Sequence, residues 1–172
     1  MRLLSFYRNP ARETSFLETY ADCLIRQIHR LAATPWGRSG PLDGAFLGGG
    51  TPTALPHTTL ERIVTALWQT IGFTSEYELT VETRAITTDT VLLRTLRNAG
   101  VNRVSLGVQS FDTDVRRGVG RFAVSARVKE TIAILADTFP QATLDLIYNL
   151  PGHTPAIWQQ DVSDMLASPA TG

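Results

Sequence analysis

The chain has 172 residues, the size of one ordinary domain and long enough to bury a hydrophobic core. Its 16 basic and 16 acidic residues cancel, so the charge balance gives no support for a nucleic-acid partner or a membrane-surface partner. No apolar run is long enough for a membrane span, and the first residues lack the pattern of a signal peptide, so we expect a cytoplasmic protein.

The first half of the chain alternates helical and strand patterns. Residues 14–33 repeat apolar side chains at steps of three and four, which predicts an amphipathic helix. A loop rich in glycine and proline follows, and then a short buried strand over residues 45–48 that runs into three glycines. Residues 58–72 predict a second helix, and residues 76–83 alternate as a strand.

The second half continues the alternation. The patterns predict helices over residues 87–100, 125–138 and 154–167, and strands over residues 101–109 and 142–150. No hairpin signal separates the strands, and parallel neighbours need long crossovers of this kind. The sequence therefore predicts one α/β domain over residues 1–172, with a parallel sheet that is either doubly wound or a full or partial (β/α) barrel.

Each of the four predicted strands carries glycine or a polar residue at or near its C-terminal end. These are Gly48 to Thr51 after the first strand, Glu82 after the second, Gln109 after the third and Asp145 inside the fourth. Because the carboxyl ends of parallel strands meet at one edge of the sheet, we expect a ligand site there.

The stretch "LGGGTPTAL", residues 47–55, has three interpretations: a phosphate cradle, a tight turn, or a loop that lets a polar ligand approach the main chain. It lacks the lysine and spacing of a Walker loop, and it is not GxGxxG, so neither nucleotide fingerprint is met. Glycines leave amides and carbonyls uncovered, which suits a ligand carrying both an ammonium and a carboxylate. The turn and the ligand loop both remain open at this point.

Five motifs give the chain a family resemblance: "FLGGGTPTAL", "LTVET", "GVNRVSLGVQSF", "GVGR" and "DLIYNLPGHT". In their order and spacing they resemble the radical S-adenosylmethionine (SAM) enzymes similar to oxygen-independent coproporphyrinogen oxidase. "FYRNPARET", near the start, is most similar to the anaerobic haem-utilisation branch, whose members open the haem ring by methyl transfer. The resemblance implies a partial parallel (β/α) barrel that lacks its first strand and its C-terminal part.

The resemblance also implies a set of SAM-binding residues. The glycine motif would bind the amino group, Arg121 the methionine carboxylate, Gln109 the ribose and Asp145 the ribose hydroxyls. The implied set consists of Gly48, Gly49, Gly50, Thr51, Glu82, Gln109, Arg121, Asp145 and Ile147, the last beside the adenine. The residues alone also allow simpler roles, with the two carboxylates as loop or helix caps and Arg121 on a solvated basic face with Arg116 and Arg117.

Enzymes of this kind hold a 4Fe-4S cluster on three cysteines spaced CxxxCxxC. The chain contains one cysteine, Cys23, in the first predicted helix, where a small apolar filler is the simplest role. Met1 aligns with about the second cysteine of that motif and Leu4 with the third. We therefore expect an incomplete core domain with no metal ligands or catalytic residues of its own, inactive as it stands.

Three activities follow from the resemblance for the parent enzyme: haem methylation with ring opening as the preferred reaction, coproporphyrinogen oxidation, and non-catalytic haem carriage. The implied partners are a tetrapyrrole, haem or porphyrinogen, and an electron donor of the flavodoxin type. The sequence departs from the family at Asn149 and His153, where glycine and glutamine are common.

Overall fold

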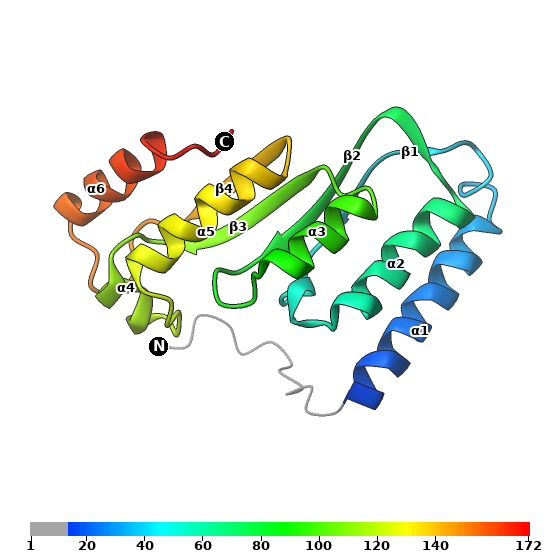
Figure 1. Ribbon diagram of the computed structural model, residues 1–172, viewed down its shortest axis with the longest axis horizontal. Coiled ribbons are helices and arrows are strands. Elements are labelled where there is room, and N and C mark those ends of the chain that lie inside the picture. Colours follow the sequence, from blue (N-terminus) through cyan, green and yellow to red (C-terminus); the bar gives the residue numbers. More distant parts are fainter. Residues whose placement is uncertain (1–13) are drawn as a thin grey trace.

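The computed structural model describes residues 14–172, so "FYRNPARET" up to residue 13, together with Met1 and Leu4, lies outside the described residues. Strands alternate with helices along the chain, as the sequence patterns predict (Figure 1). The elements are α1 (Thr14–Ala32), β1 (Leu42–Leu47), the 3-10 turn η1 (Pro52–Ala54), α2 (His57–Thr70), β2 (Phe73–Thr83), α3 (Thr90–Asn98), β3 (Arg103–Gln109), α4 (Thr113–Gly118), α5 (Ser125–Thr138), β4 (Gln141–Leu146) and α6 (Pro155–Leu166).

The four strands form one sheet in the order β1-β2-β3-β4, and every neighbouring pair is parallel. The predicted parallel sheet is therefore confirmed, with strands in sequence order, as in a barrel wall. Leu47 pairs with Val81, Val81 with Val104, and Val104 with Ala142, which gives one continuous row across the sheet. The strands follow their order in the sequence, because each crossover returns the chain to the position beside the preceding strand, always in the same direction across the sheet.

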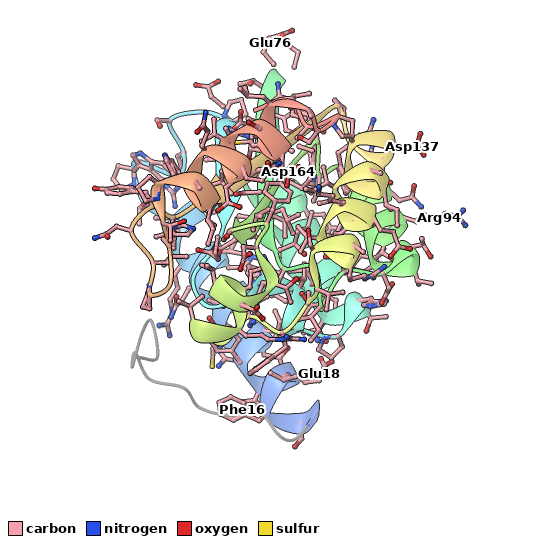
Figure 2. All side chains as sticks on the ribbon, turned by 90° about the vertical axis from the view of Figure 1, so that its left-hand side faces the viewer. Phe16, Glu18, Glu76, Arg94, Asp137 and Asp164 are labelled. Atoms are coloured by element: carbon pink, nitrogen blue, oxygen red, sulfur yellow. The ribbon has the colours of Figure 1, made fainter. Side chains whose placement is uncertain are left out.

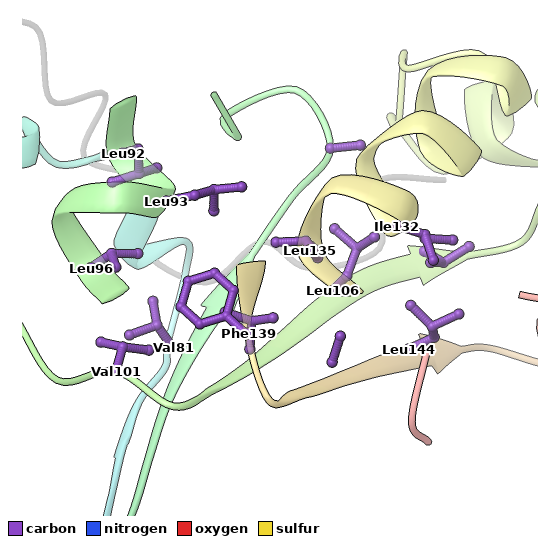
Figure 3. Packing of buried hydrophobic residues seen from close by; sticks show 14 of the residues in the cluster. Val81, Leu92, Leu93, Leu96, Val101, Leu106, Ile132, Leu135, Phe139 and Leu144 are labelled. Atoms are coloured by element: carbon purple, nitrogen blue, oxygen red, sulfur yellow. The ribbon is translucent and has the colours of Figure 1, made fainter. Parts of the chain in front are cut away.

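One face of the sheet carries the hydrophobic core. Helices α2, α3 and α5 lie side by side over this face (Figure 1), and Figure 3 shows the leucines of α3 and α5 above the strand side chains. Leu92, Leu93 and Leu96 of α3 are all essentially buried because they recur at steps of one, three and four. The side chain of Asp89 caps this helix by accepting a hydrogen bond from the Leu92 amide at 2.8 Å.

Helix α1 packs on the outside of α2 rather than on the sheet. The carboxylate of Glu18 accepts hydrogen bonds from Thr59 and Arg62, and Asp22 accepts a second one from Arg62 at 2.6 Å. The predicted apolar face of this helix is only partly covered, since Tyr20 remains 48% exposed. Among residues 14–172, α2 is the element against which α1 makes its main contact.

Candidate functional site

The face of the sheet opposite the helices carries the polar side chains. Side chains alternate along a strand, and Leu79 and Val81 of β2 belong to the core, so Glu82 points to the other face. The same alternation places Ser105 of β3 and Asp145 of β4 on that face, because Val104 and Leu144 belong to the core. The predicted ligand edge therefore adjoins a polar sheet face that the helices leave open.

The glycine loop after β1 requires its glycines. An added Cβ at Gly48 would lie 2.4 Å from the Phe46 ring and 3.4 Å from the Glu82 carboxylate, so a side chain there would displace Phe46. Gly49 and Gly50 have φ of 85° and 71°, which L-residues rarely adopt. Both are exposed, with open space where a Cβ would stand. The loop thus presents bare main chain to solvent beside Glu82.

Four threonine hydroxyls connect this loop to the end of β2. Thr53 Oγ1 lies 3.1 Å from Thr83 Oγ1 and 2.7 Å from Thr87 Oγ1, and Thr83 Oγ1 lies 2.8 Å from Thr88 Oγ1. Thr88 in turn donates to the carbonyl of Arg84 at 2.8 Å. This chain of hydroxyls fixes the glycine loop relative to Glu82. The sequence patterns did not indicate this chain of hydroxyls, although Thr53 lies only three residues after Gly50.

Asp145 is exposed near the end of β4, and one of its oxygens is already bound. Ser105 Oγ donates to Asp145 Oδ2 at 2.7 Å across the β3–β4 pair. The second oxygen, Oδ1, has no hydrogen bond among those of the described residues. The carboxylate is therefore held in one orientation while retaining the ability to accept from a ligand. Ser105 was also missed, although the strand pattern places it on the same face.

Gln109 ends β3 in a left-handed conformation, with φ of 70°. Its side-chain Nε2 lies 2.8 Å from the position that a Cβ on Gly107 would take, and Arg121 Nη2 lies 4.0 Å from that position. Glycine at 107 thus lets both side chains lie over the strand. The Gln109 carbonyl accepts from the Ile147 amide at 2.9 Å, which ties the end of β3 to the chain after β4.

Arg116 is buried, with an exposed fraction of 2%. It therefore does not lie on a solvated basic face, which the sequence had allowed. Its guanidinium donates to the carbonyls of Val108, Ser110 and Ala123. Burial, together with the positive charges of Arg121 and Arg84, lowers the pKa of Arg116 to about 10. Arg116 therefore holds the chain around residues 121–123 against the end of β3.

The loop after β4 is anchored by a buried pair. His153 Nε2 lies 3.1 Å from Asp161 Oδ2 of α6, and the two side chains are 4% and 1% exposed. The Leu150 amide donates to His153 Nδ1, which leaves the proton of the neutral ring on Nε2, facing the carboxylate. Asp161 also accepts from the Phe111 amide at 2.7 Å. The pair connects this loop to the segment that follows β3.

The described residues do not fit an iron–sulfur cluster. Within residues 14–172, no three histidine, cysteine, aspartate or glutamate side chains are grouped as metal ligands. Cys23 lies partly exposed on α1, and its sulfur is 2.9 Å from Arg26 Nη2, so it is less of an apolar filler than expected. A cluster with one open iron needs three thiolates, and the 172 residues contain one.

The predicted residues come together in two groups. Gly48 lies beside Glu82, with Gly49 and Gly50 next to it in the loop after β1. Gln109, Arg121 and Ile147 lie at the ends of β3 and β4. Asp145 belongs to the second group, because it pairs with Gly107 across β3 and β4. Thr51 precedes η1 and makes no capping hydrogen bond with its side chain.

An open groove of about 510 Å³ lies between η1 and the β2–α3 loop, where His57 Nε2 lies 3.3 Å from Asp89 Oδ2. Thr53, Thr87 and Thr88, which belong to the hydroxyl chain, line this groove. No helix among residues 14–172 is long and apolar enough to cross a membrane.

Comparison with known proteins agrees with this architecture. Residues 26–165 match the model of the Radical SAM superfamily. The chain is 31% identical to anaerobilin synthase of Escherichia coli O157:H7, over 92% of the chain and 36% of that protein. It is 35% identical to the heme chaperone HemW of Synechocystis sp., over 87% of the chain and 35% of that protein.

The structural comparison gives the same result. Coproporphyrinogen III oxidase (HemN) from Escherichia coli, a radical SAM enzyme, superposes with a TM-score of 0.78 at 27% identity, covering 89% of the chain and 35% of the enzyme. The chain thus spans about a third of the length of these relatives. The family match over most of the chain and the four-stranded parallel partial barrel together show that the chain belongs to the radical S-adenosylmethionine superfamily.

Proposed function

We propose that the carboxyl edge of this sheet binds SAM for an enzyme that acts on a tetrapyrrole. The observation that carries the proposal is the bare glycine loop beside Glu82, at the same edge as Gln109, Arg121 and Asp145. A zwitterionic methionine and a ribose need that combination of main-chain groups, a guanidinium and a carboxylate. When bound, SAM supplies the adenosyl and methyl groups on which radical SAM chemistry depends.

Each residue has one role in this proposal. The main chain of Gly48 to Gly50, with Thr51, receives the amino group of the methionine, and Glu82 supplies a negative charge beside that ammonium. The planar guanidinium of Arg121 pairs with the methionine carboxylate. Asp145, oriented by Ser105, accepts from the ribose hydroxyls. Gln109 binds the ribose and Ile147 packs on the adenine.

The preferred reaction is methyl transfer to haem with opening of the ring. The similarity to anaerobilin synthase over 92% of the chain supports this choice. Coproporphyrinogen oxidation is the alternative reaction, because oxidases of that name are 31% identical to the chain over 84% of its length. Either reaction needs a reductant, for which we propose a small flavodoxin-type protein, and it needs cluster ligands that these 172 residues do not contain.

A non-catalytic haem carrier is the second candidate function, and the similarity to two heme chaperones supports it. The two functions differ in what happens to the bound haem. A carrier releases haem to an acceptor protein without chemical change, whereas an enzyme consumes it.

Calorimetric titration of the chain with SAM tests the cofactor proposal. We expect binding to the wild type, and about tenfold weaker binding after Asp145→Asn or Arg121→Gln, because each substitution removes one charge-assisted contact. Asp137→Asn is the matched control, since Asp137 projects from α5 into solvent (Figure 2). Equal affinities for all four proteins would reject the assigned roles.

A further inference from the structure

A pocket lined by arginines lies next to the proposed cofactor site. Arg84, Arg116 and Arg121 line one small pocket at the carboxyl ends of β2 and β3. Gly107 forms part of the wall, and the Arg121 guanidinium lies over that glycine. The pocket therefore adjoins the strand end where Gln109 stands.

The positive charge of this pocket is fixed in place by the fold. Arg116 is buried and bound to three carbonyls, one of which belongs to Ala123 in the pocket wall. The charges of Arg84 and Arg121 are close enough to lower the pKa of Arg116. Asp161 is the acidic group that acts in the opposite direction on Arg116. Three guanidinium groups thus lie close together at this strand end, an arrangement that can bind an anion.

The rest of the pocket is apolar. Ile86 and Phe122 line it, and they are 63% and 70% exposed, so both can contact a ligand at the surface. Two exposed apolar side chains beside a guanidinium cluster suit a ligand that has a carboxylate on an apolar body. The methionine end of SAM does not match this surface, because it is a short zwitterion whose single carboxylate is already paired with Arg121 in the proposed function.

The pocket has a volume of about 10 Å³, room for roughly one water. We therefore propose that its mouth binds a propionate carboxylate of the tetrapyrrole, with Arg84 as its direct contact and with Ile86 and Phe122 against the macrocycle. The inference rests on the proposed function for the class of substrate. Arg121 then separates two anions, the methionine carboxylate on the side of Gly107 and the propionate on the side of Arg84. The tetrapyrrole would lie across the loops after β2 and α4, next to the cofactor.

Fluorescence titration with mesoporphyrin IX, which is free of iron and carries two propionates, tests this assignment. Its dimethyl ester has the same macrocycle but no free carboxylate. We expect Arg84→Gln to weaken mesoporphyrin binding about tenfold, Arg84→Lys to restore part of the affinity, and neither to change the affinity for SAM. The ester should bind wild type and Arg84→Gln with the same low affinity.

Two further variants separate charge from fold. Arg94→Gln makes the same change at an exposed arginine of α3 that projects into solvent (Figure 2), and it should leave both affinities unchanged. Phe122→Ser, at a side chain that is already exposed, should weaken mesoporphyrin and its ester equally.

The outcomes distinguish this inference from the proposed function. If Arg84→Gln weakens SAM binding as much as porphyrin binding, the pocket serves the methionine carboxylate and the propionate assignment is wrong. Equal porphyrin affinities for wild type and Arg84→Gln would also overturn it. A chain that binds SAM but no porphyrin would reject both this inference and the tetrapyrrole substrate. Porphyrin binding that depends on Arg84, in a chain that does not bind SAM, would support the inference and reject the cofactor proposal.

Discussion

Ser105 Oγ donates a hydrogen bond of 2.7 Å to Asp145 Oδ2, joining two neighbouring strands on the polar face of the sheet. Ser105 is 7% exposed, whereas Asp145 is exposed, so a buried hydroxyl orients a carboxylate that faces solvent. The bond leaves the other carboxylate oxygen available to a ribose hydroxyl. In this arrangement Ser105 is a positioning residue.

Ser105→Ala should weaken SAM binding about fivefold with a loss of unfolding free energy of about 1 kcal/mol or less, because it frees the Asp145 rotamer without leaving a buried group unpaired. Calorimetry and urea denaturation measure the two effects. Ser163→Ala on the exposed side of α6 is the control. Unchanged SAM affinity in Ser105→Ala would show that the orientation of Asp145 does not matter.

The chain of threonine hydroxyls predicts that one substitution lowers both the stability of the protein and its affinity for SAM. Thr53→Val keeps the shape of the side chain but removes a hydroxyl that lies within 3.1 Å of both Thr83 and Thr87. We expect a loss of about 1–3 kcal/mol in the free energy of unfolding, because Thr83 is buried and loses a partner. SAM affinity should also fall, since the glycine loop is no longer held beside Glu82.

Thr58→Val, at an exposed position of α2, controls for the effect of the substitution itself. Urea denaturation and calorimetry follow both variants. A destabilised Thr53→Val chain with normal SAM affinity would limit the hydroxyl chain to a structural role.

The His153–Asp161 pair predicts which substitutions the loop after β4 tolerates. His153→Gln can still accept from the Leu150 amide and donate to Asp161, so we expect a change of less than about 1 kcal/mol in unfolding free energy. His153→Leu leaves a buried carboxylate short of a donor and should cost about 2–3 kcal/mol. Thermal or urea unfolding of the two variants decides this, and equal losses would show that packing, not hydrogen bonding, accounts for the pair.

The 172-residue chain has one cysteine where a cluster needs three, so we expect no radical chemistry from this chain alone. After anaerobic treatment with iron and sulfide, the chain should show no cubane spectrum and should form no 5′-deoxyadenosine from SAM, because Cys23 is its one cysteine. Cys23→Ala should behave as the wild type does. A cubane spectrum that disappears in Cys23→Ala would instead indicate a cluster shared between chains.

The sequence predicted the alternation of elements well because each helix and strand has its own periodicity. The helix over residues 125–138 matches α5 at both ends, since Ser125 and Thr138 stand at the limits of its apolar repeat. Strand ends were less accurate: β2 begins at Phe73, before the predicted residue 76, because its first residues pair with the start of β1. Helix α4 was missed, since six residues are too few to show a repeat.

The side chains that support the candidate site could not be predicted in the same way. The bond between Ser105 and Asp145 joins residues 40 positions apart, and the contacts of Thr53 span 30 and 34 positions. Such contacts depend on strand register, which local patterns do not contain. The burial of Arg116 likewise depends on three carbonyls supplied by other segments, so its sequence neighbours suggested a solvated basic face.

A crystal structure of the chain with SAM tests the central claim most directly, because the claim is about where the cofactor binds. We predict that the methionine lies between the Gly48–Gly50 main chain and Arg121, with the ribose at Asp145 and the adenine beside Ile147. SAM bound instead in the groove lined by His57 and Asp89 would contradict the account.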